Sequence, residues 1–189
     1  TSHKKLILIY PNHNIATYAM IEFKLKDRRM RLIDGVFYLR AINNKGEETK
    51  KETWREARFN ETENGYLRYV LTINKVKHGF LQHRMVWYAH NQDWDIWDTS
   101  RDNSIDHRNQ NKKDNRIANL RKATHSENQQ NQDCKGCSFD KARNMWRAQI
   151  KLNGKVKYIG HYDTEEEAHE AYLAEKRTLH PYFVENEEL

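Results

Sequence analysis

Long hydrophobic runs are what this 189-residue sequence lacks most clearly. Apolar residues make up 37% of it, against about 45–50% in typical soluble domains, and its mean hydropathy is −1.09. The longest early apolar run, LILIY at 6–10, is far too short for a signal sequence or a membrane span. We therefore expect a cytoplasmic protein without membrane partners, built from small units rather than around one thick core.

Cysteine is also scarce, because Cys134 and Cys137 in the stretch CKGC are the only two. A structural zinc ion needs four Cys or His ligands, usually supplied as two such pairs, and the sequence has no second pair. We expect no structural zinc. A turn glycine between two small residues is a better interpretation of CKGC than a zinc ligand pair or a redox pair.

Basic residues outnumber acidic ones, with 33 Lys and Arg against 27 Asp and Glu, a net charge of +6 and a pI near 9.2. This excess favours a polyanionic partner. An ordinary soluble basic protein has the same composition, so charge alone does not decide between the two.

The pattern of apolar residues predicts an α+β fold in three parts. Residues 1–33 form an N-terminal segment of unknown role, with a strand expected at 4–10. Residues 34–132 contain a strand running into an Asn-Lys-Gly turn, a hairpin around 65–81 and a short helix over 82–91. Residues 133–189 form a last unit, with strands near 137–141, 145–152 and 155–160 and a helix over 164–179.

Two helix starts carry a capping box, in which a threonine precedes a glutamate by three residues. Thr124 and Glu127 open one helix, and Thr164 and Glu167 open the other. The first helix completes the order strand, long polar loop, strand, helix between residues 105 and 131. The three glutamates at 165–167 look like a catalytic cluster, but at a helix N-terminus they favour the helix dipole, and we interpret them as structural.

The stretch from 105 to 131, IDHRNQNKKDNRIANLRKATHSENQQN, is unusually rich in asparagine and carries adjacent Asp106 and His107. Aspartate is a hard oxygen ligand suited to magnesium, and histidine is suited to take a proton from water at neutral pH. Asn128, in the first turn of the expected helix, is the candidate for a second metal ligand. Because neighbours on a strand point to opposite faces, the strand must end or twist at His107.

This stretch resembles the HNH endonucleases of phages and mobile introns, whose ββα-metal motif commonly runs Asp-His-Ile-Asn-Gly-Asn, then Asp-Asn-Arg, Asn-Leu-Arg and a closing Glu-Asn. The upstream GYLRYVLTINKVKHGFLQHRMVWYAHN is similar to their preceding hairpin and helix. The resemblance implies a general base at His107, metal ligands at Asp106 and Asn128, and a loop-closing role for the catalytic-site asparagine Asn119.

Two positions depart from the family pattern: Arg108 stands where an aliphatic residue is usual, and Gln110 where glycine is usual. If the loop requires a positive φ at Gln110, that residue carries strain. Arg108 is a candidate phosphate contact. Arg116 is as suited to pairing with Asp114 as with DNA, and Arg84 to packing or phosphate contact rather than catalysis.

The last unit alternates along its middle strand, with Trp146, Ala148, Ile150 and Leu152 on one face and Arg147, Gln149 and Lys151 on the other. Such a cationic sheet face can enter a major groove, where Arg and Gln read bases and Lys holds phosphate. A merely solvated face is the alternative. Residues 135–184 also resemble the Apetala-type, ethylene-response-factor-like DNA-binding domain, which implies DNA contacts by Arg147, Gln149, Lys151 and Tyr158.

Together these features predict a DNA endonuclease that cuts double-stranded DNA with a divalent metal, most simply Mg²⁺ with Mn²⁺ as a substitute. We expect no small-molecule cofactor, a monomer or weak dimer, and the host cytosol if phage-encoded. The resemblance implies a homing-type role. Two alternatives remain: a DNA-binding protein with a degenerate, inactive nuclease fold, and a nuclease selective for branched DNA.

Overall fold

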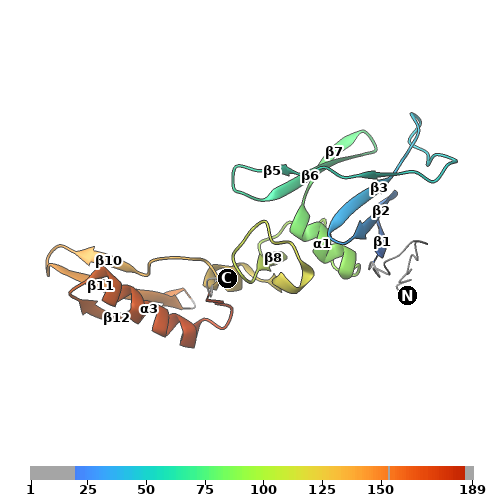
Figure 1. Cartoon of the computed structure of the whole chain (residues 1–189). Helices are drawn as coiled ribbons and strands as arrows, with labels where there is room; N and C mark the ends of the chain where they lie inside the picture. The colour runs from blue at the N-terminus through green and yellow to red at the C-terminus, as the bar shows by residue number, and fades with distance from the viewer. Residues whose placement is uncertain (1–19, 153, 186–189) are drawn as a thin grey trace, which may run out of the picture. The chain divides into compact units, whose positions relative to one another are not determined.

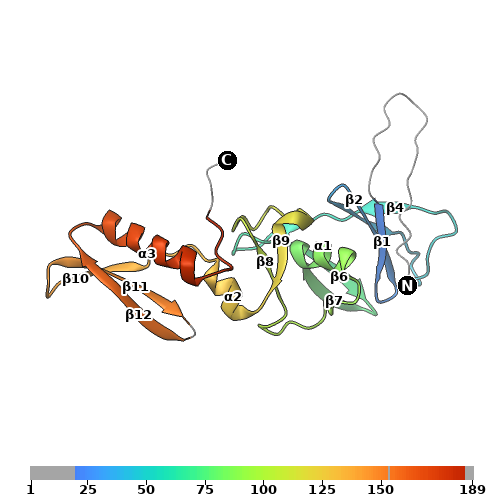
Figure 2. The ribbon, with the colours of Figure 1, turned by 90° about the horizontal axis from the view of Figure 1, so that it is seen from below.

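The computed structural model describes residues 20–152 and 154–185 (Figures 1 and 2). The strand expected at 4–10 lies outside the described residues. The chain divides into two compact units, Thr1–Asp98 with Lys112–Leu120 and Thr99–Asn111 with Arg121–Leu189. Each unit is described by itself below.

The first unit begins with a four-stranded antiparallel sheet in the order β1-β2-β3-β4. Its strands are β1 (Met20–Leu25), β2 (Arg28–Ile33), β3 (Val36–Arg40) and β4 (Trp54–Glu56). The side chains of Phe23, Met30 and Phe37, one from each of the first three strands, are buried. Strand β2, which precedes residue 34, pairs with β3, which follows it. The two strands therefore belong to one sheet, and the sequence pattern did not indicate this pairing.

A second sheet follows, made of β5 (Asn60–Glu61), β6 (Leu67–Ile73) and β7 (Val76–Leu81). The hairpin predicted around 65–81 is confirmed. Its two turn residues, Asn74 and Lys75, both have positive φ, at 49° and 65°, as a tight hairpin turn requires. Helix α1 (Gln82–His90) follows directly, as predicted, and buries Met85, Val86 and Ala89.

The central stretch forms β8 (Ser104–His107), the 3₁₀ turn η1 (Ile117–Asn119), β9 (Leu120–Ala123) and α2 (His125–Gln130). Strands β8 and β9 make a two-stranded sheet. The predicted capping box at the start of α2 is confirmed, since Thr124 and Glu127 exchange hydrogen bonds of 3.2 and 2.7 Å. The order is therefore strand, loop, strand, helix, as the sequence predicted.

The C-terminal part of the second unit is an antiparallel sheet of β10 (Cys137–Asp140), β11 (Met145–Leu152) and β12 (Lys155–Tyr162). Helix α3 (Glu165–Leu179) covers one face of this sheet (Figure 2). Ala148, Ile150, Ala168 and Tyr172 form the core between them. The predicted strands, helix and second capping box are all confirmed.

Gly136 lies between the two cysteines of CKGC, at a position that requires glycine. It has a φ of 64°, and a Cβ atom there would lie 2.0 Å from the ring of Tyr172. Cys134 and Cys137 are free thiols, and Cys134 Sγ lies 2.7 Å from Tyr172 Oη. The turn needs glycine for both its backbone and its packing.

The fold class is α+β, with small antiparallel sheets and few helices. Among the described residues, none of the helices combines the length and apolar character needed to cross a membrane.

Candidate active site

Strand β8 carries both of the adjacent residues that the sequence singled out. Asp106 and His107 are 6% and 4% exposed, so both side chains lie inside the fold. The strand ends at His107, whose carbonyl accepts a 2.9 Å hydrogen bond from Gln110 N–H. This tight turn is where the chain leaves the strand, as the sequence required.

The carboxylate of Asp106 is held by two side chains. Arg121, on β9, donates from Nε and Nη2 to Oδ2 at 2.9 and 2.7 Å. Asn131, which caps the C-terminus of α2, donates from Nδ2 to the same oxygen at 3.1 Å. Each of these bonds has an ionised acceptor, which makes it stronger than a neutral bond. Asp106 is therefore fixed in position.

The arrangement of these donors leaves the two carboxylate oxygens unequal. Oδ2 of Asp106 accepts three N–H groups, whereas the contact to Oδ1 from a described residue is a long one, 3.4 Å from Asn131 Nδ2. A carboxylate has about four lone-pair sites, so Oδ1 keeps the capacity to bind a cation. A hard oxygen donor of this kind fits Mg²⁺ or Mn²⁺.

Asn128, the predicted second metal ligand, lies half-buried in α2. Helix α2 contacts β8, which places Asn128 on the element that packs against the strand of Asp106. The described residues contain no group of three or more His, Cys, Asp or Glu side chains placed to hold a metal ion. A site here would rest on one carboxylate and one amide, completed by water and phosphate oxygens.

Asn119 closes the polar loop. Its Nδ2 donates to the carbonyl of Asp114 at 2.7 Å, and its own N–H donates to the carbonyl of Arg116 at 2.9 Å. The side chain is buried, at 8% exposure. These bonds fix the end of the loop just before β9. The family resemblance implies this loop-closing role for Asn119.

Gln110 has the positive φ that would strain a residue other than glycine, as considered from the sequence. Its φ is 59°, in the left-handed region where a residue with a Cβ costs more than glycine. Its side chain donates from Nε2 to the carbonyl of Val184 at 3.4 Å. The loop therefore carries a strain that glycine would avoid.

Sequence reasoning missed Arg121 and Asn131, although they make the closest contacts to Asp106. Asn131 is 2% exposed, and besides Asp106 its Nδ2 reaches the carbonyls of His107 at 2.8 Å and Arg108 at 3.2 Å. One signal was available, because Asn131 follows Asn128 by three residues and so lies on the same side of α2. No pattern in the sequence assigns Arg121 to Asp106.

The three arginines proposed to contact DNA near the nuclease site lie in different environments. Arg84 donates from Nη2 to the carbonyls of Ile96 and Asp98 at 3.1 and 2.7 Å and lies over the Trp94 ring, and burial lowers its pKa. Arg116 is exposed and forms a bidentate ion pair with Asp114. Arg108 is exposed. Their contact with DNA stays a prediction.

The residues proposed to contact DNA in the C-terminal sheet lie on the paired strands β11 and β12. Gln149 pairs with Tyr158, and Arg147 pairs with His161, across β11 and β12. Lys151 and Tyr158 are exposed, while Arg147 and Gln149 are half-buried. Arg147 Nε is buried without a hydrogen-bond partner among the described residues. The four predicted contact residues thus share one sheet, and their role stays a prediction.

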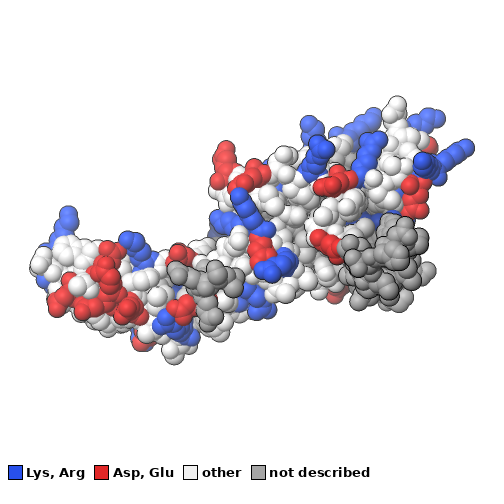
Figure 3. All heavy atoms as spheres, viewed as in Figure 1, with Lys and Arg blue, Asp and Glu red and all other residues white. Residues whose placement is uncertain are grey.

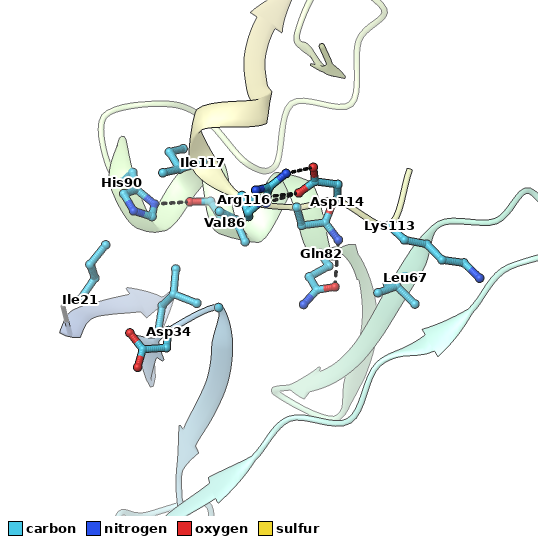
Figure 4. A pocket seen from close by; sticks show the side chains of 13 residues that line it. Ile21, Asp34, Leu67, Gln82, Val86, His90, Lys113, Asp114, Arg116 and Ile117 are labelled. Carbon is cyan, nitrogen blue, oxygen red and sulfur yellow. Dashed lines mark hydrogen bonds and ion pairs between the residues drawn. The ribbon is translucent and has the colours of Figure 1, made fainter. Parts of the chain in front are cut away.

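A separate cavity of about 550 Å³ lies within the first unit (Figure 4). Apolar side chains from β1, β6 and α1 line it, among them Ile21, Leu67 and Val86. Its polar side includes the Asp114–Arg116 ion pair and Asn115, which donates to Gln82 Oε1 at 2.9 Å. Asp106 and His107 do not line this cavity.

Comparison with known families places a nuclease in the same stretch. The family model described as HNH endonuclease matches residues 80–130, which run from the end of β7 through α1, β8 and β9 to the last residue of α2. The match supports an HNH nuclease domain there, and hence a hydrolase with a nucleic acid substrate. The search of curated proteins and the search of solved structures each returned no match.

Proposed function

We propose that the protein is a metal-dependent endonuclease that hydrolyses phosphodiester bonds in double-stranded DNA. The observation that carries this proposal is the pair of buried residues at the end of β8, a fixed carboxylate and an imidazole, inside the stretch that matches the HNH family. Phosphodiester hydrolysis needs an activated water and a means of stabilising charge on the phosphate and leaving oxygen. The pair supplies candidates for both.

In this mechanism His107 accepts the proton of the attacking water. His107 is the last residue of β8, and its carbonyl accepts the hydrogen bond that closes the following turn. Asp106 and Asn128 would hold the divalent metal, which when bound stabilises the departing 3′ oxygen. Asn119 keeps the polar loop closed through its bond to the carbonyl of Asp114.

The C-terminal sheet supplies affinity and site choice in the same proposal. Its two sides differ in charge, because α3 carries Glu165, Glu166, Glu167, Glu170 and Glu175. Acidic side chains gather over this helix in Figure 3. The acidic side chains disfavour DNA on that side, whereas Arg147 and Lys151 alternate along β11 with the buried Ala148 and Ile150. The exposed strand face is therefore the side suited to DNA.

The proposal includes a homing-type role, which the family resemblance implies, together with a monomer or weak dimer and, if the protein is phage-encoded, action in the cytosol of the host cell. Magnesium is the proposed metal, with manganese as a substitute.

Cleavage of supercoiled plasmid and of mixed genomic DNA, with Mg²⁺ or Mn²⁺, tests the nuclease directly. The parent is compared with His107→Ala, with a chelated reaction and with His125→Ala, an exposed histidine at the start of α2. We expect nicked or linear DNA with the parent and His125→Ala, and none in the other two reactions. Cleavage by His107→Ala at the parent rate would refute the assignment of the general base.

A second candidate, a DNA-binding protein with an inactive nuclease fold, is favoured by the positive φ of Gln110. It predicts that the parent retards duplex DNA but cuts neither substrate in any metal. Gln110→Gly would then be the variant to restore cutting. A four-way junction added to the same reactions tests the branched-DNA alternative, which requires faster cleavage of the junction than of the linear duplex.

A further inference from the structure

The chain returns to the nuclease site after α3. We call residues 181–185 the return segment; in Figure 2 it lies beside α2. Val184 N–H donates to Asn131 Oδ1 at 3.1 Å, and the carbonyl of Tyr182 accepts a hydrogen bond from Arg121 Nη2. The ring of Tyr182 lies 4.6 Å from the guanidinium carbon of Arg121. The return segment thus contacts two side chains of the site.

These two side chains are the ones that hold Asp106. Arg121 and Asn131 donate three N–H groups to Oδ2 of the carboxylate, whereas their contact to Oδ1 is the long one from Asn131 Nδ2, so Oδ1 keeps capacity for a cation. Each of them also bonds to the return segment, since Arg121 donates to a carbonyl and Asn131 Oδ1 accepts from an N–H, and Asn131 Nδ2 donates in addition to the carbonyls of His107 and Arg108. The return segment, the two side chains and the carboxylate therefore form one continuous network.

The bond from Val184 supports the orientation of the Asn131 amide in which Nδ2 faces Asp106. Nδ2 is a donor and Oδ1 an acceptor, and an amide turned by 180° would place Oδ1 against the carboxylate. Because Val184 N–H needs an acceptor, it holds Oδ1 on its own side and Nδ2 on the side of Asp106. Nδ2 also donates to the carbonyls of His107 and Arg108, so the Val184 N–H reinforces an orientation that these acceptors favour too, and its loss loosens the hold on Asn131.

The return segment is itself tied to α3. Arg177 donates from Nε to Glu185 at 2.8 Å, and Phe183 lies with its ring 4.2 Å from Lys176 Nζ. Phe183 N–H also bonds to the carbonyl of His180 at 2.9 Å. The helix that covers the C-terminal sheet therefore fixes the segment that reaches the nuclease site.

We propose that the return segment is a working part of the nuclease site: through the positioning residues Arg121 and Asn131 it orients Asp106 to bind the divalent metal. This rests on the proposed function, in which Asp106 is a metal ligand. Residues that orient a metal-binding side chain typically change metal affinity by about 10–100-fold when altered. Losing the return segment's hold has the same kind of effect, without touching a ligand.

Val184 offers a matched pair of variants. Val184→Pro removes the N–H that Asn131 accepts, because proline has none, whereas Val184→Ala keeps it and removes only side-chain bulk. Mn²⁺ binding is measured for the full chain by the electron paramagnetic resonance of free Mn²⁺. Duplex binding is measured in chelator, and plasmid cleavage over a range of Mn²⁺ concentrations.

We expect Val184→Pro to bind Mn²⁺ about tenfold more weakly than the parent and to recover the parent cleavage rate at saturating Mn²⁺. Val184→Ala should stay within about twofold of the parent, and duplex binding should be the same in all three proteins. If the proline variant is poorly folded by circular dichroism, Tyr182→Ala, which removes the ring from Arg121, takes its place with the same expected direction.

Unchanged Mn²⁺ affinity in the proline variant, with the parent binding and cutting normally, overturns the positioning proposal and leaves the proposed function standing. Tighter Mn²⁺ binding in that variant also overturns it, because the segment would then oppose the metal. A parent that neither binds Mn²⁺ nor cuts DNA overturns both the proposed function and this inference.

Discussion

The nuclease hairpin and the C-terminal sheet follow one another in the chain, but they differ in the kinds of residue that they bury. In the hairpin of β8, β9 and α2, Asp106, His107 and Asn131 are buried polar residues joined by hydrogen bonds. In the sheet of β10–β12 and its helix, Ala148, Ile150 and Ala168 form an apolar core. The hairpin also buries Ile105, Leu120 and Ala123, and the sheet unit also buries Lys176 and His180. What distinguishes the hairpin is the hydrogen-bonded polar network around Asp106.

The two helices that open with the same capping box sharpen this difference. Helix α2 has six residues and buries none of its own, while α3 has fifteen and buries Ala168, Tyr172 and Lys176. A helix as short as α2 is not stable by itself in water. It depends on its cap and on the network around Asn131, so its stability and the geometry of the site are linked.

The largest expected effect is on the chemistry of the hairpin. His107→Ala should lower the cleavage rate by about 10²–10⁴-fold, the usual contribution of a general base. The rate is measured on plasmid DNA at saturating metal, beside the exposed-residue control His125→Ala. Duplex binding by the variant should match that of the parent, and a parallel loss of binding would count against a purely chemical role.

The next effect is on the core of the sheet. Ile150→Ala should lower the free energy of unfolding by about 2–5 kcal/mol, because the side chain is 2% exposed and its removal leaves a cavity. Urea titration followed by circular dichroism measures this. Val156→Ala, at a site 62% exposed on the same sheet, should change it by less than about 0.5 kcal/mol. Equal losses in the two variants would contradict the assigned core.

A smaller effect separates the two capping boxes. Thr164→Ala and Thr124→Ala each remove a side-chain bond to a helix N–H and should cost about 1 kcal/mol. Only Thr124→Ala should also weaken Mn²⁺ binding, because α2 carries Asn128 and ends at Asn131. Thr124→Ser keeps the hydroxyl and serves as the control. Equal Mn²⁺ affinity in both alanine variants would break the link between α2 and the site.

His180, just before the return segment, gives the sheet unit a dependence on pH. Burial, the largest cause, lowers its pKa below the ordinary value, and Lys176 acts in the same direction. The unfolded chain therefore binds a proton more readily, so stability is greatest above about pH 6.5 and falls as the pH drops toward the lowered pKa. His180→Gln should reduce this slope in urea titrations from pH 7.5 to 5, whereas His125→Gln should keep it.

The smallest expected change is at the strained turn of the hairpin. Gln110→Gly removes the cost of a positive φ and adds backbone entropy to the unfolded chain, for a net gain of about 0.5 kcal/mol. Gln110→Ala loses the same side-chain bond to Val184 but keeps the strain, so it should be less stable than the glycine variant. Thermal unfolding measures the stability of the parent and the two variants. A glycine variant less stable than the alanine variant would show that the positive φ does not destabilise this turn.

The sequence predicted the local elements where the pattern was strong. The alternation along residues 65–81 and the two Thr-x-x-Glu signals each depend on a few neighbouring residues, and the structure has the hairpin and both caps. The β1–β2 hairpin was missed because MIEFKLKDRRMRLI mixes basic and apolar residues. Its turn at Lys26, with a φ of 54°, lacks the usual glycine or asparagine.

By itself the sequence determined the residue types of the site, the order of its strands and helix, and the two capped helices, because these depend on short-range spacing. Only the tertiary structure decided that Arg121 and Asn131 hold Asp106 and that Tyr182 and Val184 hold them in turn. These partners lie 15 to 61 residues apart. Such pairs form only when folding brings distant segments together and each buried polar group must find a partner.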